Sequence, residues 1–293
     1  MTLEFEGKTL IGCTSDFDHA ELVIVGAPFD GTTSFRPGAR FAPSQMRIES
    51  VGLETYSPYF DADLTDFRIC DYGNLDLPFG STKRALQLIQ EQVCQILAED
   101  KKLLLIGGEH LISLPAIKEA KHKYADLVVI HFDAHTDLRT EYMGEPLSHS
   151  TVIRSVWELL GDGRIWQFGI RSGTRTEFSW AKAGHTHLQL HNFDGLAEAI
   201  TAIGSRPVYL TIDLDVLDPS IFPGTGTPEA GGVSFLDLLH ALKAIASLNI
   251  IGSDLVELSP HYDQSGTSTA VACKVFRELA IALCLRPSPL LLE

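Results

Sequence analysis

Three segments of the chain place metal-binding residue types directly after apolar runs. They are "KLLLIGGEH" (102–110), which ends in His110, "VVIHFDAHTD" (128–137), with Asp133, His135 and Asp137, and "VYLTIDLDV" (208–216), with Asp213 and Asp215. A buried carboxylate or imidazole is unfavourable unless a partner compensates its charge or polarity. Because residues two apart in an extended chain point the same way, we expect the side chains of each segment to share one side.

These residues form a set of two imidazoles and four carboxylates. Such a set suits hard or borderline divalent ions better than a thiolate-seeking metal. Four carboxylates are more than one ion needs, whereas two ions roughly 3.5–4 Å apart, bridged by carboxylates and a hydroxide, would balance four negative charges. We expect two manganese ions per subunit, because manganese suits carboxylate-rich octahedral sites.

Each segment alone also has a structural interpretation. An Asp-x-Asp pair at a strand end is commonly a turn or a helix cap, and His110 can cap a following helix. The coincidence of all three segments at strand ends favours a metal site. His131 lies deeper in its strand and is interpreted as a core histidine, whereas His185, His187 and His191 are interpreted as a surface cluster.

Apolar runs alternate with helix-like segments along the chain. Strands are expected at 21–28, 67–73, 102–108, 126–135, 164–170, 207–216 and 249–258, and helices at 81–100, 234–248 and about 267–284. Near-continuous apolar strands are typical of a parallel sheet covered on both faces. We therefore predict one α/β domain over residues 1–293, a doubly wound, mostly parallel sheet of about eight strands with helices on both faces. In such sheets, ligands bind at the carboxyl ends of the strands.

Composition excludes several classes of protein. The formal charge of −15 disfavours nucleic-acid binding, which needs clustered Lys and Arg. We interpret most of this charge as a contribution to solubility. No apolar run approaches the roughly 20 residues that span a bilayer. The start "MTLEFEGKTL" lacks the hydrophobic region of a signal peptide, and the five scattered cysteines indicate free thiols. A cytoplasmic location is expected.

Five ordered motifs over residues 20 to 285 resemble the ureohydrolase family of arginases and agmatinases. They are "GGEH" (107–110), "DAHTD" (133–137), "SHST" (148–151), "TIDLDVLDP" (211–219) with "GTGTPEAGG" (224–232), and "DLVELSPHYD" (254–263). The segments at 28–47 and 69–80 are similar to the agmatinase branch. The resemblance implies an arginase-like fold and a dinuclear manganese centre that hydrolyses a guanidinium group and releases urea. It also implies a homo-oligomer, a trimer or a hexamer.

The resemblance assigns roles to individual residues. The metal ligands would be the six residues reached from spacing. Glu257 would bind the guanidinium by paired charge-assisted hydrogen bonds. Asp137 would bind metal and pass on the proton of the hydroxide, and His149 would shuttle a proton at the mouth of the cleft, where the ordinary pKa of histidine is suitable.

Two positions depart from many relatives. Glu109 stands where they have Asp, a change beside the first ligand that could alter metal affinity. Ser150 stands where many have Gly, and it could narrow the rim of the active site.

The loop at 138–146 bears on the substrate. Glu141 and Glu145 are compatible with a cationic tail, whereas Arg139 could bind a carboxylate instead. Agmatine is favoured, with putrescine and urea as products, and 4-guanidinobutyrate and arginine are the alternatives. An inactive homologue that keeps its metals and acts as a binding protein is the alternative from another class. A zinc deacetylase is disfavoured by the excess of carboxylates, and a dinuclear phosphatase by the scarcity of Lys and Arg.

Overall fold

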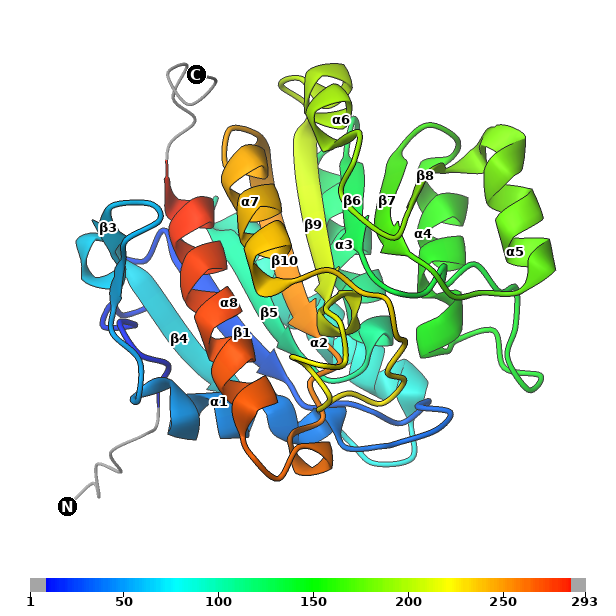
Figure 1. Cartoon of the computed structure of the whole chain (residues 1–293). Helices are drawn as coiled ribbons and strands as arrows, with labels where there is room; N and C mark the ends of the chain where they lie inside the picture. Colours follow the sequence, from blue (N-terminus) through cyan, green and yellow to red (C-terminus); the bar gives the residue numbers. More distant parts are fainter. Residues whose placement is uncertain (1–8, 286–293) are drawn as a thin grey trace.

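The central feature of the computed structural model, which describes residues 9–285, is an eight-stranded parallel sheet (Figure 1). Across the sheet the strands are β4 (Ile69–Asn74), β1 (Leu22–Ala27), β5 (Lys102–Gly107), β10 (Asn249–Val256), β9 (Pro207–Asp213), β6 (Val128–Phe132), β7 (Ile165–Ile170) and β8 (His187–Leu190). A separate antiparallel pair consists of β2 (Tyr56–Ser57) and β3 (Ala62–Asp63).

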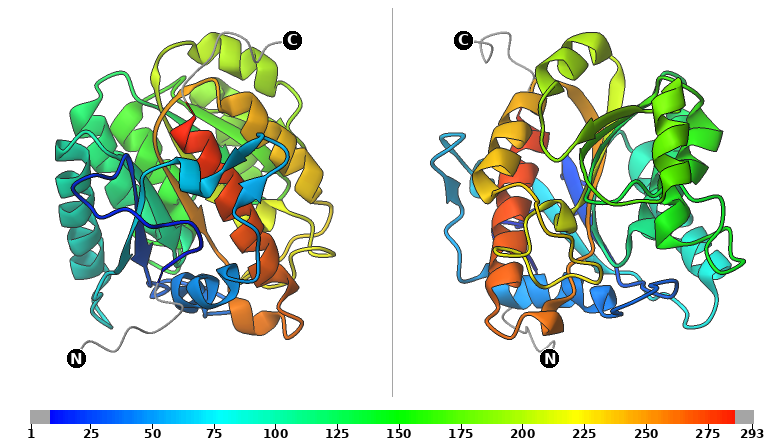
Figure 2. Two further views of the ribbon diagram at one scale, coloured as in Figure 1. Left: turned by 90° about the vertical axis from the view of Figure 1, so that its left-hand side faces the viewer. Right: turned by 45° about the vertical axis from the view of Figure 1, so that its right-hand side comes forward.

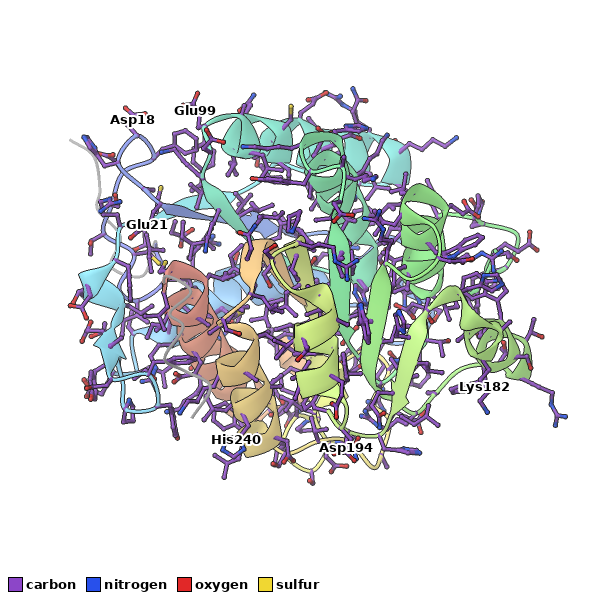
Figure 3. The ribbon with its side chains drawn as sticks, turned by 90° about the horizontal axis from the view of Figure 1, so that it is seen from above. Asp18, Glu21, Glu99, Lys182, Asp194 and His240 are labelled. Carbon is purple, nitrogen blue, oxygen red and sulfur yellow. The ribbon has the colours of Figure 1, made fainter. Side chains whose placement is uncertain are left out.

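Helices cover both faces of the sheet. The α-helices are α1 (Ala42–Ser50), α2 (Thr82–Ala98), α3 (Ser113–Lys123), α4 (Val152–Leu160), α5 (Arg175–Trp180), α6 (Leu196–Ile203), α7 (Phe235–Ile245) and α8 (Thr267–Cys284). Short 3-10 helices span Ala39–Phe41, Leu64–Asp66, His110–Ile112, His149–Thr151, Leu214–Val216 and Pro260–Tyr262, and a π-helical turn spans Ala181–His185. Figures 2 and 3 show the two helical layers, with His240 of α7 and Glu99, which follows α2, on opposite sides.

The pattern of side chains along the strands explains this architecture. In β1, Leu22 and Ile24 pack into the hydrophobic core shared with α1, α6, α7 and α8, whereas Val23 and Val25 pack into the core shared with α2, α3 and α4. Successive side chains of a strand point to opposite faces. A strand that is apolar at every position therefore needs a helical layer on each side, and the predicted fold class is confirmed.

The predicted elements differ from the observed ones mainly at their ends. The helix predicted at about 267–284 matches α8, and the Ser234–Asp237 capping box at the start of α7 is confirmed. The strand predicted at 126–135 ends at Phe132, and the one at 207–216 ends at Asp213. The edge strand β8 was not predicted, because its residues are only partly buried or exposed.

Residues 1–8 and 286–293 of the predicted single domain lie outside the described part of the chain. Within residues 9–285, no helix combines the length and apolar character needed to span a bilayer.

Candidate active site

The predicted site residues follow four adjacent strands, β5, β10, β9 and β6, at the centre of the sheet. His110 begins the 3-10 helix after β5, Asp133 directly follows β6, Asp213 ends β9, and Glu257 directly follows β10. Because the strands are parallel, their carboxyl ends meet at one edge. The sheet order therefore brings segments that are distant in sequence into one cluster.

Turns, and not strand alternation, direct the ligand side chains toward one another. The Asp133 carboxylate accepts a hydrogen bond from His135 N (2.5 Å), and Asp137 has a left-handed backbone (φ 52°). Asp213 caps the next 3-10 helix by accepting from Asp215 N (2.9 Å). The expectation that extended backbone sets these directions was wrong, because both strands end before the last ligands.

Five of the six predicted metal ligands belong to two overlapping groups of donor atoms, and Asp213 lies beside His110 of the first group. His110 Nδ1 is 3.1 Å from Asp133 Oδ2, 3.2 Å from Asp137 Oδ2 and 3.4 Å from Asp213 Oδ2. His135 Nδ1 is 3.0 Å from Asp215 Oδ2 and 3.5 Å from Asp133 Oδ1. Donor atoms of His110, Asp133 and Asp137, together with that of His131, form one group, and those of Asp133, His135 and Asp215 form the other. Asp133 belongs to both groups.

The cluster has the properties of a cation site. The buried Nδ1 of His110 faces the three carboxylates without an aligned hydrogen bond. Burial and the negative charge of Asp133 raise the pKa of Asp137 to about 7. Burial, with the charges of Asp215 and Asp133, also raises the pKa of Asp213 well above its ordinary value. Crowded, desolvated carboxylates are stabilised by bound cations, so these residues fit divalent metal ions.

A buried chain of hydrogen bonds supports His110 from behind. His110 Nε2 is 2.8 Å from Thr211 Oγ1, and Thr211 Oγ1 donates to Asp254 Oδ1 (2.6 Å). Since the Thr211 hydroxyl donates to Asp254, it accepts from the N–H at Nε2 of His110. This arrangement leaves Nδ1 of His110 as the nitrogen that faces the carboxylates and can bind a metal. Sequence patterns did not single out Thr211 or Asp254.

Arg171 braces the loop that carries Asp215. Its guanidinium donates to the backbone carbonyls of Asp215 (2.7 Å) and Glu229 (2.7 Å), and to that of Val216 (3.2 Å). Arg171 therefore joins the loop after β7 to two segments that follow β9. It also lacked a signal in the sequence, because its partners are main-chain atoms of distant segments.

Glu257 lies in the wall of the adjacent cavity and is buried. Its Oε1 accepts a hydrogen bond from His110 N (2.8 Å), which fixes its position relative to the metal donors. Its backbone is left-handed (φ 67°), a conformation that costs a non-glycine residue on the order of 1–3 kcal/mol. Burial and the neighbouring Glu109 charge raise the pKa of Glu257 well above its ordinary value, so a cationic partner would stabilise its charged form.

His149 is half-buried at the cavity and contacts the loop after β1. Its backbone N donates to Thr32 Oγ1 (3.1 Å), and its Nε2 is 3.0 Å from Ser34 Oγ. Burial and the positive charges of His135 and His110 lower the pKa of His149 to about 4. The expectation that this histidine keeps its ordinary pKa was wrong, because the site desolvates the ring.

The two departures from the family pattern lie beside this region. Glu109 is fully buried and accepts from Thr32 N (2.8 Å) and Thr33 Oγ1 (3.1 Å). Its carboxylate therefore anchors the loop that contacts His149. Ser150 contributes to the cavity lining, in line with its expected place at the rim.

The cavity beside the donor cluster has a volume of about 240 Å³. Its lining consists of Ser34, His135, Thr136, Asp137, Arg139, Tyr142, His149, Ser150, Ser172, Gly173, Thr174, Glu177, Asp213, Thr227 and Glu257. Glu141 and Glu145, the predicted tail contacts, are absent from this lining and are exposed. They flank a tight turn in which Tyr142 and Glu145 exchange two backbone hydrogen bonds of 2.9 Å. The structure therefore does not bring these two residues into the cavity lining.

Glu177 is an acidic residue of the cavity lining that the sequence analysis did not single out. It accepts hydrogen bonds from Thr136 Oγ1 (2.8 Å), Leu138 N (3.1 Å) and Thr174 N (2.7 Å). Arg139 Nε lies 3.9 Å from its Oε2, and the guanidinium of Arg139 lies over the Tyr142 ring at 5.1 Å. Thr174 and Glu177 form a capping box at the start of α5, a pattern that indicates a helix start but not a cavity.

Comparisons with known proteins agree with this fold. A model described as the arginase family matches residues 20–282. The chain is 47% identical to an agmatinase of Bacillus subtilis over 94% of this chain and 97% of the relative. It is 33% identical to a guanidinobutyrase of Pseudomonas aeruginosa, over 93% and 88% of the two chains. A crystal structure of a candidate agmatinase from Clostridium difficile is 50% identical, with a TM-score of 0.90 over 92% of this chain and 99% of the other. The chain belongs to the arginase family.

Proposed function

We propose that this protein hydrolyses agmatine to putrescine and urea with two manganese ions bound by His110, Asp133, His135, Asp137, Asp213 and Asp215. The observation that carries the proposal is the buried Glu257 carboxylate, held by His110 N beside the donor cluster and facing the cavity. A carboxylate binds a guanidinium by two parallel charge-assisted hydrogen bonds. The similarity to relatives named agmatinase supports agmatine as the guanidine.

The charges of the cavity also favour a cationic substrate. Glu257 and Glu177 are buried carboxylates of the lining that lie outside the proposed ligand set. Arg139 could attract an anionic tail, but it lies near Glu177 and over Tyr142. Agmatine carries a guanidinium and an ammonium, whereas 4-guanidinobutyrate would require Arg139 to face its carboxylate. Because one relative is named a guanidinobutyrase, 4-guanidinobutyrate is the second candidate substrate.

In the proposed mechanism, the residues of the chain hold the substrate and move protons. Glu257 holds the guanidinium against the donor cluster. When bound, two divalent ions supply a water-derived nucleophile at neutral pH. Asp137 accepts a proton from the nucleophile at its carboxylate and passes it to the amine nitrogen, which leaves as putrescine when its bond to the guanidinium carbon breaks. His149 relays a proton between the cavity and solvent without retaining it, because its pKa of about 4 keeps the ring neutral.

Urea release from the manganese-loaded protein tests this proposal, with agmatine, arginine and 4-guanidinobutyrate at equal concentrations. We expect the highest kcat/KM for agmatine. A preference for another guanidine would retain the reaction and overturn the substrate. No urea from any of the three, with metal bound, would favour the binding-protein alternative.

Manganese binding is expected to be at least about tenfold weaker at pH 6 than at pH 8. With a pKa of about 7 in the metal-free chain, Asp137 is mostly protonated at pH 6 and mostly ionised at pH 8. A cation must displace that proton. At one pH unit below the pKa of the carboxyl, this competition weakens metal binding about tenfold. Burial opposes protonation of His110 and His135, but the neighbouring carboxylates outweigh burial and raise the pKa of both histidines. Protons on these two ligands therefore also weaken metal binding at the lower pH. Calorimetric titration at pH 6, 7 and 8 measures the effect, and equal affinities would contradict it.

We also propose that the protein is a homo-oligomer, a trimer or a hexamer, as the family resemblance implies, and that it is cytoplasmic, as its free thiols indicate. Light scattering coupled to size exclusion measures the mass of the assembly. A monomeric mass at micromolar concentration would overturn this part of the proposal.

A further inference from the structure

His131 is a buried histidine whose two ring nitrogens both have partners beside the metal donors. It lies in β6 with no exposed surface. Its Nε2 is 2.7 Å from Asp133 Oδ2, and its Nδ1 is 3.1 Å from the side-chain nitrogen of Gln167, in β7. Its donor atoms lie within the same group as those of His110, Asp133 and Asp137. By position alone, His131 is either a metal ligand or a support for one.

The orientation of the Gln167 amide distinguishes these roles. Its nitrogen donates to the carbonyl oxygen of Thr136 (2.9 Å), which can only accept. Its oxygen accepts from Thr186 Oγ1 (2.9 Å), so both ends of the amide are fixed. The amide nitrogen therefore also donates to Nδ1 of His131. In a neutral imidazole that accepts at Nδ1, the proton is on Nε2, which donates to the Asp133 carboxylate.

This arrangement makes His131 a poor ligand and a good support. Neither nitrogen has a free lone pair, because Nδ1 accepts from Gln167 and Nε2 carries the proton. Asp133 is then held at two points, with Oδ2 bound by His131 and Oδ1 by His135 N (2.5 Å). Gln167 also holds Thr136 O within the loop that carries His135 and Asp137. One glutamine thus fixes both the strand and the ligand loop.

We propose that His131 and Gln167 form a positioning pair that orients Asp133, the carboxylate common to both donor groups, and thereby sets metal affinity. The inference rests on the metal site of the proposed function. Partners that hydrogen-bond to a metal-binding carboxylate typically contribute 10–100-fold to metal affinity. Because Asp133 belongs to both groups, the pair acts on the binding of both ions.

Manganese binding to variants of the metal-free protein tests the pair directly, without an activity assay. His131→Leu removes the donor, whereas His131→Gln keeps an N–H donor in the region of Nε2. We expect affinity to fall about 10–100-fold in His131→Leu and to recover most of that loss in His131→Gln. Gln167→Leu, which frees the imidazole to change tautomer, should also weaken binding. His187→Gln is the matched control, because this exposed histidine stacks on Trp166 of β7.

The free Mn²⁺ signal in electron paramagnetic resonance gives both affinity and stoichiometry, and melting of the metal-free variants separates affinity from folding. Unchanged affinity in a folded His131→Leu protein would overturn the inference. If His131→Gln and His131→Leu lose the same amount of bound manganese, the inference would also be overturned, since His131 would then be a metal ligand. If His131→Leu does not fold, Gln167→Leu decides by the same measurement. Absence of manganese binding in the unmodified chain would refute the metal site of the proposed function instead.

Discussion

Replacing Glu257 with glutamine is expected to leave the metal content unchanged and to lower kcat/KM for agmatine by about 10²–10³-fold. The substitution keeps an oxygen that can accept from His110 N, so the ligand stays in place. It removes the negative charge that would pair with a guanidinium. Loss of one partner from a buried charge pair costs roughly 2–5 kcal/mol, and each 1.4 kcal/mol is about tenfold in rate.

Steady-state urea release and elemental analysis on the same preparation measure both parts of this prediction. Glu145→Gln is the control, since it makes the same change on the exposed turn outside the cavity, and it should stay within about twofold of the unmodified protein. Near-native kcat/KM in Glu257→Gln would show that another group holds the guanidinium. Loss of metal from this variant would instead indicate that the contact with His110 is its main role.

The sequence was sufficient to predict the sheet because burial on both faces leaves a strong pattern. Strands such as β5 and β6 are apolar at nearly every position, and only a sheet between two helical layers buries such strands fully. The edge strand β8 lacks this pattern because His187 is exposed and its neighbours are only partly buried. Edge strands have one neighbour and less burial, so their residues are less constrained.

The candidate ligands were predictable for a similar reason, since charged residues at the ends of buried strands are unfavourable without compensation. Their supports were not predictable. Thr211, Gln167 and Glu177 are ordinary residue types, and each acts through a partner from a distant segment. Thr211 is 101 positions from its partner His110, and Glu177 is 41 positions from its partner Thr136.

The position of Glu141 and Glu145 outside the cavity lining has a local cause. Two left-handed residues between them, Met143 (φ 52°) and Gly144 (φ 83°), close a tight turn. Its tip lies in solvent, where Met143 is 88% exposed. Acidic composition alone could not show which way this loop faces.

Asp133→Asn is expected to reduce the content of both metal ions, from about two per chain to well below one. Asp133 contributes to both donor groups, whereas Asp215 contributes to only one, so Asp215→Asn should remove a single ion. The amide lacks the charge that offsets the desolvation of a buried cation, and its nitrogen cannot coordinate as the carboxylate oxygen does.

Elemental analysis after dialysis against dilute Mn²⁺ measures the contents, and circular dichroism confirms that the variants fold. Asp18→Asn, an exposed position at the rim of the molecule in Figure 3, makes the same chemical change away from the site and should retain both ions. Two ions in Asp133→Asn would exclude a bridging role for this carboxylate. Loss of both ions in Asp215→Asn as well as in Asp133→Asn would mean that the two ions bind cooperatively. Removing a ligand of one ion would then release both, and no shared carboxylate would be needed to couple them.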